Sequence, residues 1–341
     1  MSAPVEAAGV ERGGRRPRFK FRLSAAQRGI LIAIAIFAVM FAVYGWKQPV
    51  GLTANVINTA SNKGALLALV AMAQTLPVLT GGLDLSVGAI FVLANCLAST
   101  IVVGDPVSTT LGIIAVLFVG LLCGATNGII IVYGRLQPLI VTLAMGAVYF
   151  GIALALRPQP GGSVNFELAD FMTRSTFAIP HSAILLLLVV VFIWIPYRRS
   201  VLGRAAFAIG SAEQAAYMSG VPVDRAKVLA FALSGLLAAI GGLLLTAITY
   251  SGAAKISIAN DYTLNSIGAV VIGGTSLFGG VGSAIGSIFG AFVMRTVGDL
   301  LIVFDINPVL QPLFVGIVLL VAVCIGSLRV LRVKNKLDLY R

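Results

Sequence analysis

Residues 197–227, YRRSVLGRAAFAIGSAEQAAYMSGVPVDRAK, are the longest polar interruption in a chain that is otherwise almost entirely apolar. Apolar runs at residues 180–196 and 228–250 flank it, and each is long enough for a helix to cross the roughly 30 Å of hydrocarbon in a bilayer. Its five basic residues place it on the cytoplasmic face by the positive-inside rule. Residues 210–220 predict a short helix between a Gly-Ser start and a Ser-Gly stop. This helix is too short to be a domain, and its size suits a segment that another protein grips.

The composition places the whole chain among the polytopic helical membrane proteins. Of its 341 residues, 59% are hydrophobic and only 11% are charged, whereas about a quarter of the residues in a soluble domain are charged. The apolar runs are continuous and lack the alternation that a transmembrane β-barrel requires. The net charge of +12 comes from tails and loops beside these runs, which indicates orientation against an anionic leaflet. We therefore predict an all-α transmembrane bundle in contact with membrane lipid, and no nucleic-acid partner.

The length criterion predicts about ten spans, with both termini in the cytoplasm. A basic tail of residues 1–28 precedes a transmembrane domain of residues 29–328, and a second basic tail covers residues 329–341. The first apolar run has no small-residue cleavage site after it, so we expect an uncleaved span and not a signal peptide. The spans are expected at approximately residues 29–46, 57–79, 85–103, 109–133, 138–156, 180–196, 228–250, 263–278, 283–304 and 309–328.

The positions of the Lys and Arg residues support this orientation. The predicted cytoplasmic side holds seven in the first tail, one at Arg135, five in residues 197–227 and five in the last tail, which is eighteen of the 24. The longest predicted outside loop, residues 157–179, begins with the turn signals of RPQPGG. It is either an ordinary connection or a docking surface for an outside partner.

Two glycine-rich segments join consecutive spans with almost no room for a loop. They are residues 80–88, TGGLDLSVG, and residues 272–283, IGGTSLFGGVGS. Glycines allow sharp backbone turns and close helix contacts. Non-helical backbone at this depth is tolerated only where it is buried in protein or lines water. Neither segment contains G-x-x-x-x-G-K-[ST], so we do not expect a phosphate-binding loop.

Polar residues along the spans are candidates for lining a path through the membrane. An Asp that follows a turn, such as Asp84, most often caps the next helix, and Ser86 is a second candidate for this cap. A direct role of Asp84 in a translocation path is the alternative. Polar side chains within spans either bind a hydroxyl-rich solute or tie helices together. The candidate path residues are Asn58, Thr80, Asp84, Ser86, Asn95 and Asn127.

Two charged residues fall within the ninth predicted span. Arg295 and Asp299 stand four residues apart, so they share a helix face and are expected to neutralise each other. Ionisable residues inside a membrane are functional candidates by default. An ion-gradient-driven secondary transporter is therefore the alternative function, with Asp299 as its ion-binding acid.

The chain lacks the motifs of an enzyme. It contains a single histidine, His181, and neither a G-x-S-x-G nor an H-E-x-x-H motif. A metal site needs several converging ligands, so His181 alone does not indicate one. We expect no catalytic residues, no metal and no cofactor in this chain.

The residues quoted above also carry a family resemblance. TGGLDLSVG at residues 80–88 resembles the T-G-G-I-D-L-S-V-G motif of ribose-type permease subunits of bacterial ABC sugar importers. Residues 203–221 resemble the cytoplasmic coupling segment of that family, with Ser211 where some members have Asn. IGGTS and the glycines at 279, 280 and 282 are similar to its later glycine-rich stretch. The resemblance covers roughly residues 50 to 325.

The resemblance implies a permease that imports a monosaccharide, a pentose or a hexose, across the bacterial plasma membrane. Its implied partners are a cytoplasmic ABC ATPase, a periplasmic or extracellular sugar-binding protein, and a second permease that is identical or paralogous. The run RPQPGG resembles members that transport furanose sugars or pentoses. The residues implied in contact with the ATPase are Arg204, Gly210, Ser211, Glu213, Ala216, Ser219 and Gly220.

Overall fold

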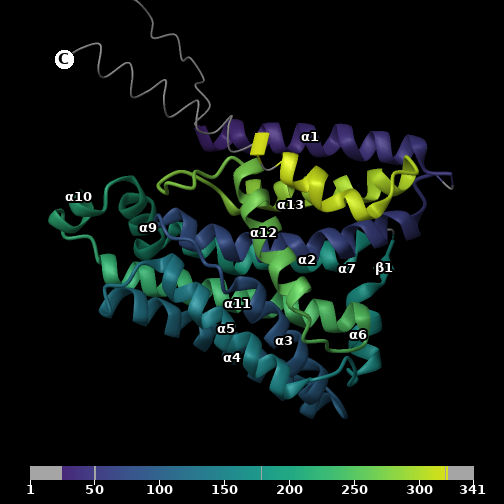
Figure 1. Cartoon of the computed structure of the whole chain (residues 1–341), viewed down its shortest axis with the longest axis horizontal. Coiled ribbons are helices and arrows are strands. Elements are labelled where there is room, and N and C mark those ends of the chain that lie inside the picture. Colours follow the sequence, from purple (N-terminus) through teal and green to yellow (C-terminus); the bar gives the residue numbers. More distant parts are fainter. Residues whose placement is uncertain (1–24, 50, 178, 319, 322–341) are drawn as a thin grey trace, which may run out of the picture.

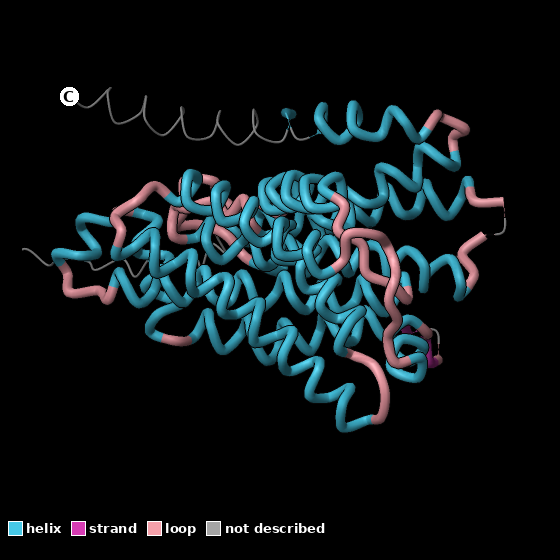
Figure 2. The backbone as a smooth tube through the Cα atoms, turned by 60° about the horizontal axis from the view of Figure 1, so that its bottom comes forward, coloured by secondary structure: helices cyan, strands magenta, loops and turns pink. Residues whose placement is uncertain are grey.

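The computed structural model describes residues 25–49, 51–177, 179–318 and 320–321. These residues form a bundle of helices with one small two-stranded sheet (Figures 1 and 2). The first half contains α1 (Ala25–Lys47), α2 (Ala54–Leu79), α3 (Val87–Ile101), α4 (Pro106–Tyr133), α5 (Pro138–Leu156), α6 (Phe166–Thr173), β1 (Ser175–Thr176) and β2 (Ile179–Pro180). The second half contains α7 (His181–Val189), η1 (Val190–Trp194), α8 (Ile195–Arg199), α9 (Val201–Ser211), α10 (Glu213–Met218), α11 (Val223–Thr249), α12 (Ile256–Ile272), α13 (Ala284–Val303) and η2 (Pro308–Leu310).

Within the described residues, seven helices are long and apolar enough to cross a membrane. They are α1, α2, α4, α5, the continuous helix His181–Arg199, α11 and α13. The third predicted span overlaps α3, which has 15 residues, and the eighth, predicted at residues 263–278, overlaps α12, which has 17 residues and both begins and ends earlier than predicted. Both helices are short because each adjoins a glycine-rich segment that leaves the helical conformation. The tenth predicted span, residues 309–328, lies partly outside the described residues. Most of the first basic tail and all of the second also lie outside them.

Helix α2 forms the centre of the bundle and α1 lies at its edge. In the most apolar 18-residue stretch of α2, 89% of the residues are buried, against 11% in the corresponding stretch of α1. Small residues on α2 allow its neighbours to approach closely: Gly64, for example, lies directly against the ring of Phe292 on α13. Around α2 pack α11, α13, α12 and α7, while α1 packs mainly on α13. Figure 1 shows α1 as the outermost helix on its side of the molecule.

The helix from His181 to Arg199 contains a π-helical turn, η1, between α7 and α8. The backbone stays in the right-handed helical region at both junctions, so the helix is continuous. Its buried side chains include Ser182, whose hydroxyl is 3.0 Å from that of Ser61 on α2, and Trp194.

Candidate functional site

The predicted cytoplasmic segment folds into two short helices that precede α11. The prediction of one helix over residues 210–220 is wrong in its bounds, because Gly210 and Ser211 form the end of α9 and α10 begins at Glu213. Ala212 separates the two helices, since its φ of −163° and ψ of 95° are those of an extended residue. The segment is therefore a bent helical pair and not a single helix.

A small apolar core holds this pair against the start of α11. It consists of Ala205, Ile209, Ala216, Val223 and Ala226. The Lys227 ammonium contacts the Glu213 carboxylate at 2.5 Å and so ties the start of α10 to α11. The Arg204 guanidinium donates to the carbonyl oxygen of Arg199 at 2.5 Å. Ala216, one of the residues predicted to contact the ATPase, is therefore buried in the small apolar core that holds α9 and α10 against α11.

The outer surface of α10 is exposed and partly apolar. Glu213, Ser219 and Gly220 are exposed, and Gly220 has a φ of +75°, which suits glycine. The side chains with the largest apolar surface here are Tyr217, 70% exposed, and Met218, 84% exposed. Sequence reasoning missed both, although aromatic residues and Met are typical of the cores of protein interfaces.

The end of α9 touches the second glycine-rich segment and the last residue of α2, which directly precedes the first. A Cβ atom on Gly210 would lie 2.1 Å from the carbonyl oxygen of Leu79 and 2.2 Å from the amide nitrogen of Gly280. The Gly280 amide donates to that same Leu79 oxygen at 3.1 Å. A Cβ atom on Gly279 would lie 2.8 Å from the amide nitrogen of Gly81. We name these four glycines, Gly81, Gly210, Gly279 and Gly280, the glycine junction.

The glycine junction brings together three parts of the chain that are far apart in sequence. Positive φ angles at Gly81, Gly279 and Gly280 confirm that these glycines let the backbone turn sharply. The backbones touch directly, with no side chain between them. Any displacement of the end of α9 must therefore move the two glycine-rich segments or separate from them.

Asp84 lies at the centre of a buried polar network. Its Oδ1 accepts from the amide of Ser86 at 3.0 Å and from the Ser86 hydroxyl at 2.6 Å, and its Oδ2 accepts from the Ser234 hydroxyl at 3.1 Å. The Asn127 amide donates to the Ser86 hydroxyl at 2.8 Å, and the Tyr149 hydroxyl donates to Asn127 Oδ1 at 3.0 Å. The network joins the segment before α3 to α4, α5 and α11.

The Asp84 carboxylate therefore braces the entry to α3 by accepting from the Ser86 amide. The residue in the N-cap position itself is Ser86, whose side chain makes no capping hydrogen bond. Asp84, Ser86 and Asn127 are fully buried. In this conformation they tie helices together, and their role in a solute path stays a prediction.

The other candidate path residues also bond to protein groups. The Thr80 hydroxyl donates to the Pro77 carbonyl at 2.7 Å. The Asn95 amide joins α3 to α11 through the Thr246 hydroxyl at 2.8 Å, and its oxygen accepts from the Ala253 amide. Asn58 donates to the Thr173 carbonyl at the end of α6, at 2.8 Å.

Asp299 forms its ion pair with a residue other than the one predicted. Its carboxylate lies 3.4 Å from the Lys63 ammonium on α2. Within the described residues Arg295 forms no ion pair, although it lines the same cavity as Asp299. The prediction of an Arg295–Asp299 pair is thus replaced, because α2 packs against α13 and brings Lys63 to the carboxylate.

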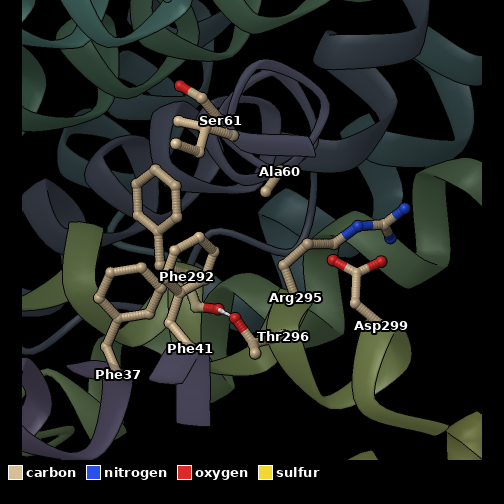
Figure 3. A pocket seen from close by; sticks show the side chains of 9 residues that line it. Phe37, Phe41, Ala60, Ser61, Phe292, Arg295, Thr296 and Asp299 are labelled. Atoms are coloured by element: carbon tan, nitrogen blue, oxygen red, sulfur yellow. Dashed lines mark hydrogen bonds between the residues drawn. The ribbon is translucent and has the colours of Figure 1, made fainter. Parts of the chain in front are cut away.

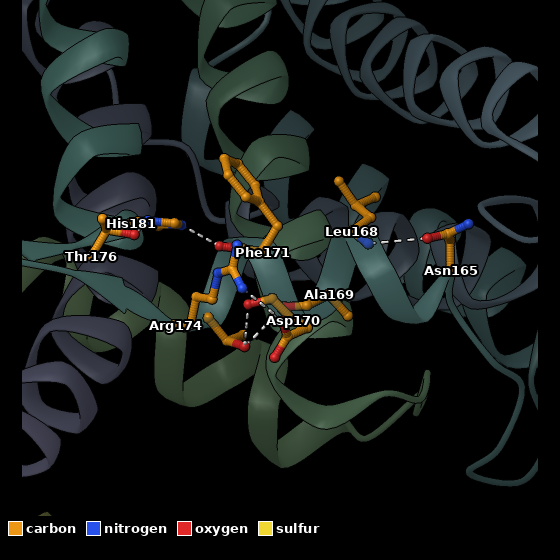
Figure 4. A network of polar contacts seen from close by, with 9 residues as sticks. Asn165, Leu168, Ala169, Asp170, Phe171, Arg174, Thr176 and His181 are labelled. Carbon is orange, nitrogen blue, oxygen red and sulfur yellow. Dashed lines mark hydrogen bonds and ion pairs between the residues drawn. The ribbon is translucent and has the colours of Figure 1, made fainter.

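The loop between α5 and α7 is more ordered than its turn signals indicate. Asn165 caps α6 by accepting from the Leu168 amide at 3.0 Å, and Arg174 pairs with Asp170 at 3.6 Å (Figure 4). Both ring nitrogens of His181 have partners, the carbonyl of Phe171 and the hydroxyl of Thr176. His181 therefore fastens this loop to the start of α7.

Comparison with known proteins supplies the family. The family model described as the permease component of branched-chain amino acid transport systems matches residues 55–323. The ribose import permease of Bacillus subtilis is 36% identical over 264 residues, which cover 76% of this chain and 80% of that protein. The fructose import permease of Rhizobium meliloti is 33% identical, with 77% and 75% covered. The D-allose permease of Escherichia coli is 29% identical, with 86% and 90% covered. No solved structure gives a significant match.

These matches extend over the helices, the glycine-rich segments and the bent helical pair described above. The relatives are transport permeases. The chain is a multi-pass protein of the bacterial plasma membrane, in agreement with its seven long apolar helices among the described residues. The chain therefore belongs to the ribose-type permease family of bacterial ABC importers.

Proposed function

We propose that this chain is the transmembrane permease subunit of an ABC importer that carries a monosaccharide into the cell. A separate cytoplasmic ATPase binds α10 and supplies the energy by hydrolysing ATP. A sugar-binding protein outside the cell delivers the solute to a pair of permeases. The observation that carries the proposal is the direct contact of Gly210 on α9 with Gly280 in the second glycine-rich segment and with Leu79, the residue directly before the first. A movement imposed on α10 has, through α9, a short route into the membrane domain.

The proposed topology has ten spans and cytoplasmic termini. The first nine predicted spans each overlap a helix, and the five basic residues of residues 197–227, which contain the bent helical pair, favour its location in the cytoplasm. In this topology α10 faces the ATPase, and the loop that contains α6 faces outward. That loop then presents the exposed rings of Phe166, Phe171 and Phe177 to the outside.

The monosaccharide class rests on the relatives. Their names specify ribose, fructose and D-allose, and these sugars span pentoses and hexoses. The family model is named for amino acids, whereas the individual relatives are named for sugars. In this proposal, the binding protein that delivers the solute determines which monosaccharide is carried.

Reconstitution tests the proposal directly. The permease, its genetically adjacent ATPase and binding protein are placed in proteoliposomes, and uptake of labelled ribose, fructose and allose is followed with and without ATP. We expect uptake of at least one monosaccharide that requires both ATP and the binding protein. Uptake that follows an imposed ion gradient and ignores ATP would favour a secondary transporter instead.

We expect Glu213→Ala and Gly220→Ala to leave membrane insertion intact and to uncouple transport from ATP hydrolysis. The first removes the partner of Lys227, and the second places a Cβ atom on a residue with a φ of +75°. Sugar taken up per ATP hydrolysed should fall about tenfold, as for loss of a well-placed interface contact. Glu167→Ala, an exposed acid on α6, is the control. Wild-type uptake in both variants would contradict this assignment of α10.

Tyr217→Ala should weaken association with the ATPase. An exposed aromatic ring at the centre of an interface commonly contributes about 2 kcal/mol or more, which corresponds to roughly thirtyfold in affinity. The measurement is the dissociation constant between the purified ATPase and the permease in nanodiscs. Phe177→Ala removes another exposed ring, 96% exposed, in the loop that contains β1 and β2, and should leave this constant unchanged. An equal effect of the two substitutions would argue against docking at α10.

A further inference from the structure

A cavity of about 200 Å³ lies between α1, α2 and α13 (Figure 3). Its walls are mostly apolar and include Phe37 and Phe41 of α1, Ala60 of α2 and Phe292 of α13. The rings of Phe37 and Phe292 are 5.3 Å apart between centroids, so they form one aromatic surface. Arg295 and Asp299 supply its charged groups.

Arg295 brings an uncompensated positive charge to this cavity. Its Nε is buried and has no hydrogen-bond partner, and the guanidinium forms no ion pair within the described part of the chain. The Asp299 carboxylate in the same cavity is neutralised by Lys63 at 3.4 Å. Lys63 does not line the cavity itself, but together with Arg295 and Asp299 it forms a group of two cations and one acid, whose net charge is +1, and the unsatisfied donor in this group belongs to Arg295.

The cavity lies at the edge of the bundle, and in the proposed topology, with the end of α13 at the membrane surface, it lies within the depth of one lipid leaflet. Arg295 precedes the end of α13 at Val303 by eight residues, which is about 12 Å along a helix axis. One leaflet contributes roughly 15 Å of hydrocarbon. Helix α1 forms the outer wall, and only 11% of the residues in its most apolar 18-residue stretch are buried. A charge at this position must find an anion or extend to the headgroups.

We propose that this cavity binds one anionic phospholipid. The guanidinium of Arg295 donates to the phosphodiester oxygens, which match its planar arrangement of donors. One acyl chain lies against Phe37, Phe41 and Phe292, and the rest of the lipid remains in the bilayer. The cavity is smaller than the roughly 300–1,000 Å³ of sites that enclose a drug-sized molecule, so it holds only part of the lipid. The proposal does not depend on which solute is transported.

Native mass spectrometry of the full-length permease tests this site. The purified protein is titrated with phosphatidylglycerol and with phosphatidylcholine of identical acyl chains. We expect one phosphatidylglycerol per permease to bind at least about tenfold more tightly than phosphatidylcholine. Arg295→Gln should remove this preference. Lys47→Gln removes a cation at the exposed end of α1 outside the cavity, and should change the affinity less than about twofold.

A second variant tests the apolar half of the cavity. Ala60→Phe keeps Arg295 and fills the space beside Phe37, so it should also lower phosphatidylglycerol binding about tenfold. It also keeps the test decisive if Arg295→Gln does not fold. Equal binding of both lipids to the wild type, or full binding to Ala60→Phe, would overturn the proposal. Displacement of the lipid by a monosaccharide would also overturn it and would place the cavity on the solute path.

Discussion

Gly210→Val is expected to lower sugar uptake strongly while the ATPase continues to hydrolyse ATP. Even one Cβ atom at this position would lie 2.1 Å from the Leu79 carbonyl oxygen and 2.2 Å from the Gly280 amide nitrogen. Both neighbours are backbone atoms, so they cannot rotate away as a side chain would. The end of α9 must therefore separate from the glycine-rich segments, at an overpacking cost of about 1–3 kcal/mol. Uptake should fall by about 5- to 150-fold, since that cost opposes the arrangement that transmits movement.

Gly151→Ala is the matched control for this experiment. Gly151 lies within α5, and a Cβ atom there would meet no other atom within 4 Å. Ala also has the higher helix propensity, by about 1 kcal/mol, so this variant should transport normally. ATP hydrolysis and uptake are measured on the same proteoliposomes. Normal uptake by Gly210→Val would show that the glycine junction does not transmit movement.

Asp84→Ala should cause the largest loss of stability among single substitutions in the buried polar network. It leaves three donors without their acceptor: the Ser86 amide, the Ser86 hydroxyl and the Ser234 hydroxyl. Each buried donor left unpaired costs about 1–3 kcal/mol in soluble proteins, and less where a membrane protein finds another partner. We expect the free energy of unfolding to fall by at least about 2 kcal/mol, measured in mixed detergent micelles.

Two variants separate this effect from the general loss of a carboxylate. Asp105→Ala removes the N-cap of α4, where the side chain accepts from exposed amides, and should cost about 0.5–2 kcal/mol. Asp84→Asn keeps one carbonyl oxygen as an acceptor and should lie between the wild type and Asp84→Ala. If Asp84→Ala were as stable as the wild type, the network would not be the brace that joins α3 to α4, α5 and α11.

The sequence predicted the long elements well because hydropathy acts over about 20 residues and one missing contact does not change it. The bounds of α10 were missed for the opposite reason. Gly210 and Ser211 are weak helix formers, so local propensity places a helix start at this pair, whereas the structure makes both the last residues of α9. Gly210 was noticed as part of a motif, but its close contact with Gly280 depends on how distant segments pack.

The ion pair of Asp299 shows the same limit. A spacing of four residues indicates a neighbour on the same helix, and Arg295 satisfied that rule. The residue that holds the carboxylate, Lys63, is 236 positions away and reaches it only because α2 and α13 pack together. In the loop of residues 157–179, the sequence predicts the turn at RPQPGG. It does not predict helix α6, although Asn165 caps the start of this helix.

The π-helical turn in the helix from His181 to Arg199 changes the rotational phase of that helix. Successive residues of an α-helix are rotated by about 100°, so Trp194, twelve positions after Ser182, would otherwise point about 120° away from it. A π turn accommodates one additional residue and removes about 100° of this offset. Trp194 consequently stays buried on the same side as Ser182, together with Leu186, Val189 and Tyr197. A relative with one residue fewer in this turn would keep the same buried face with an ordinary α-helix, so gaps in aligned sequences are expected here.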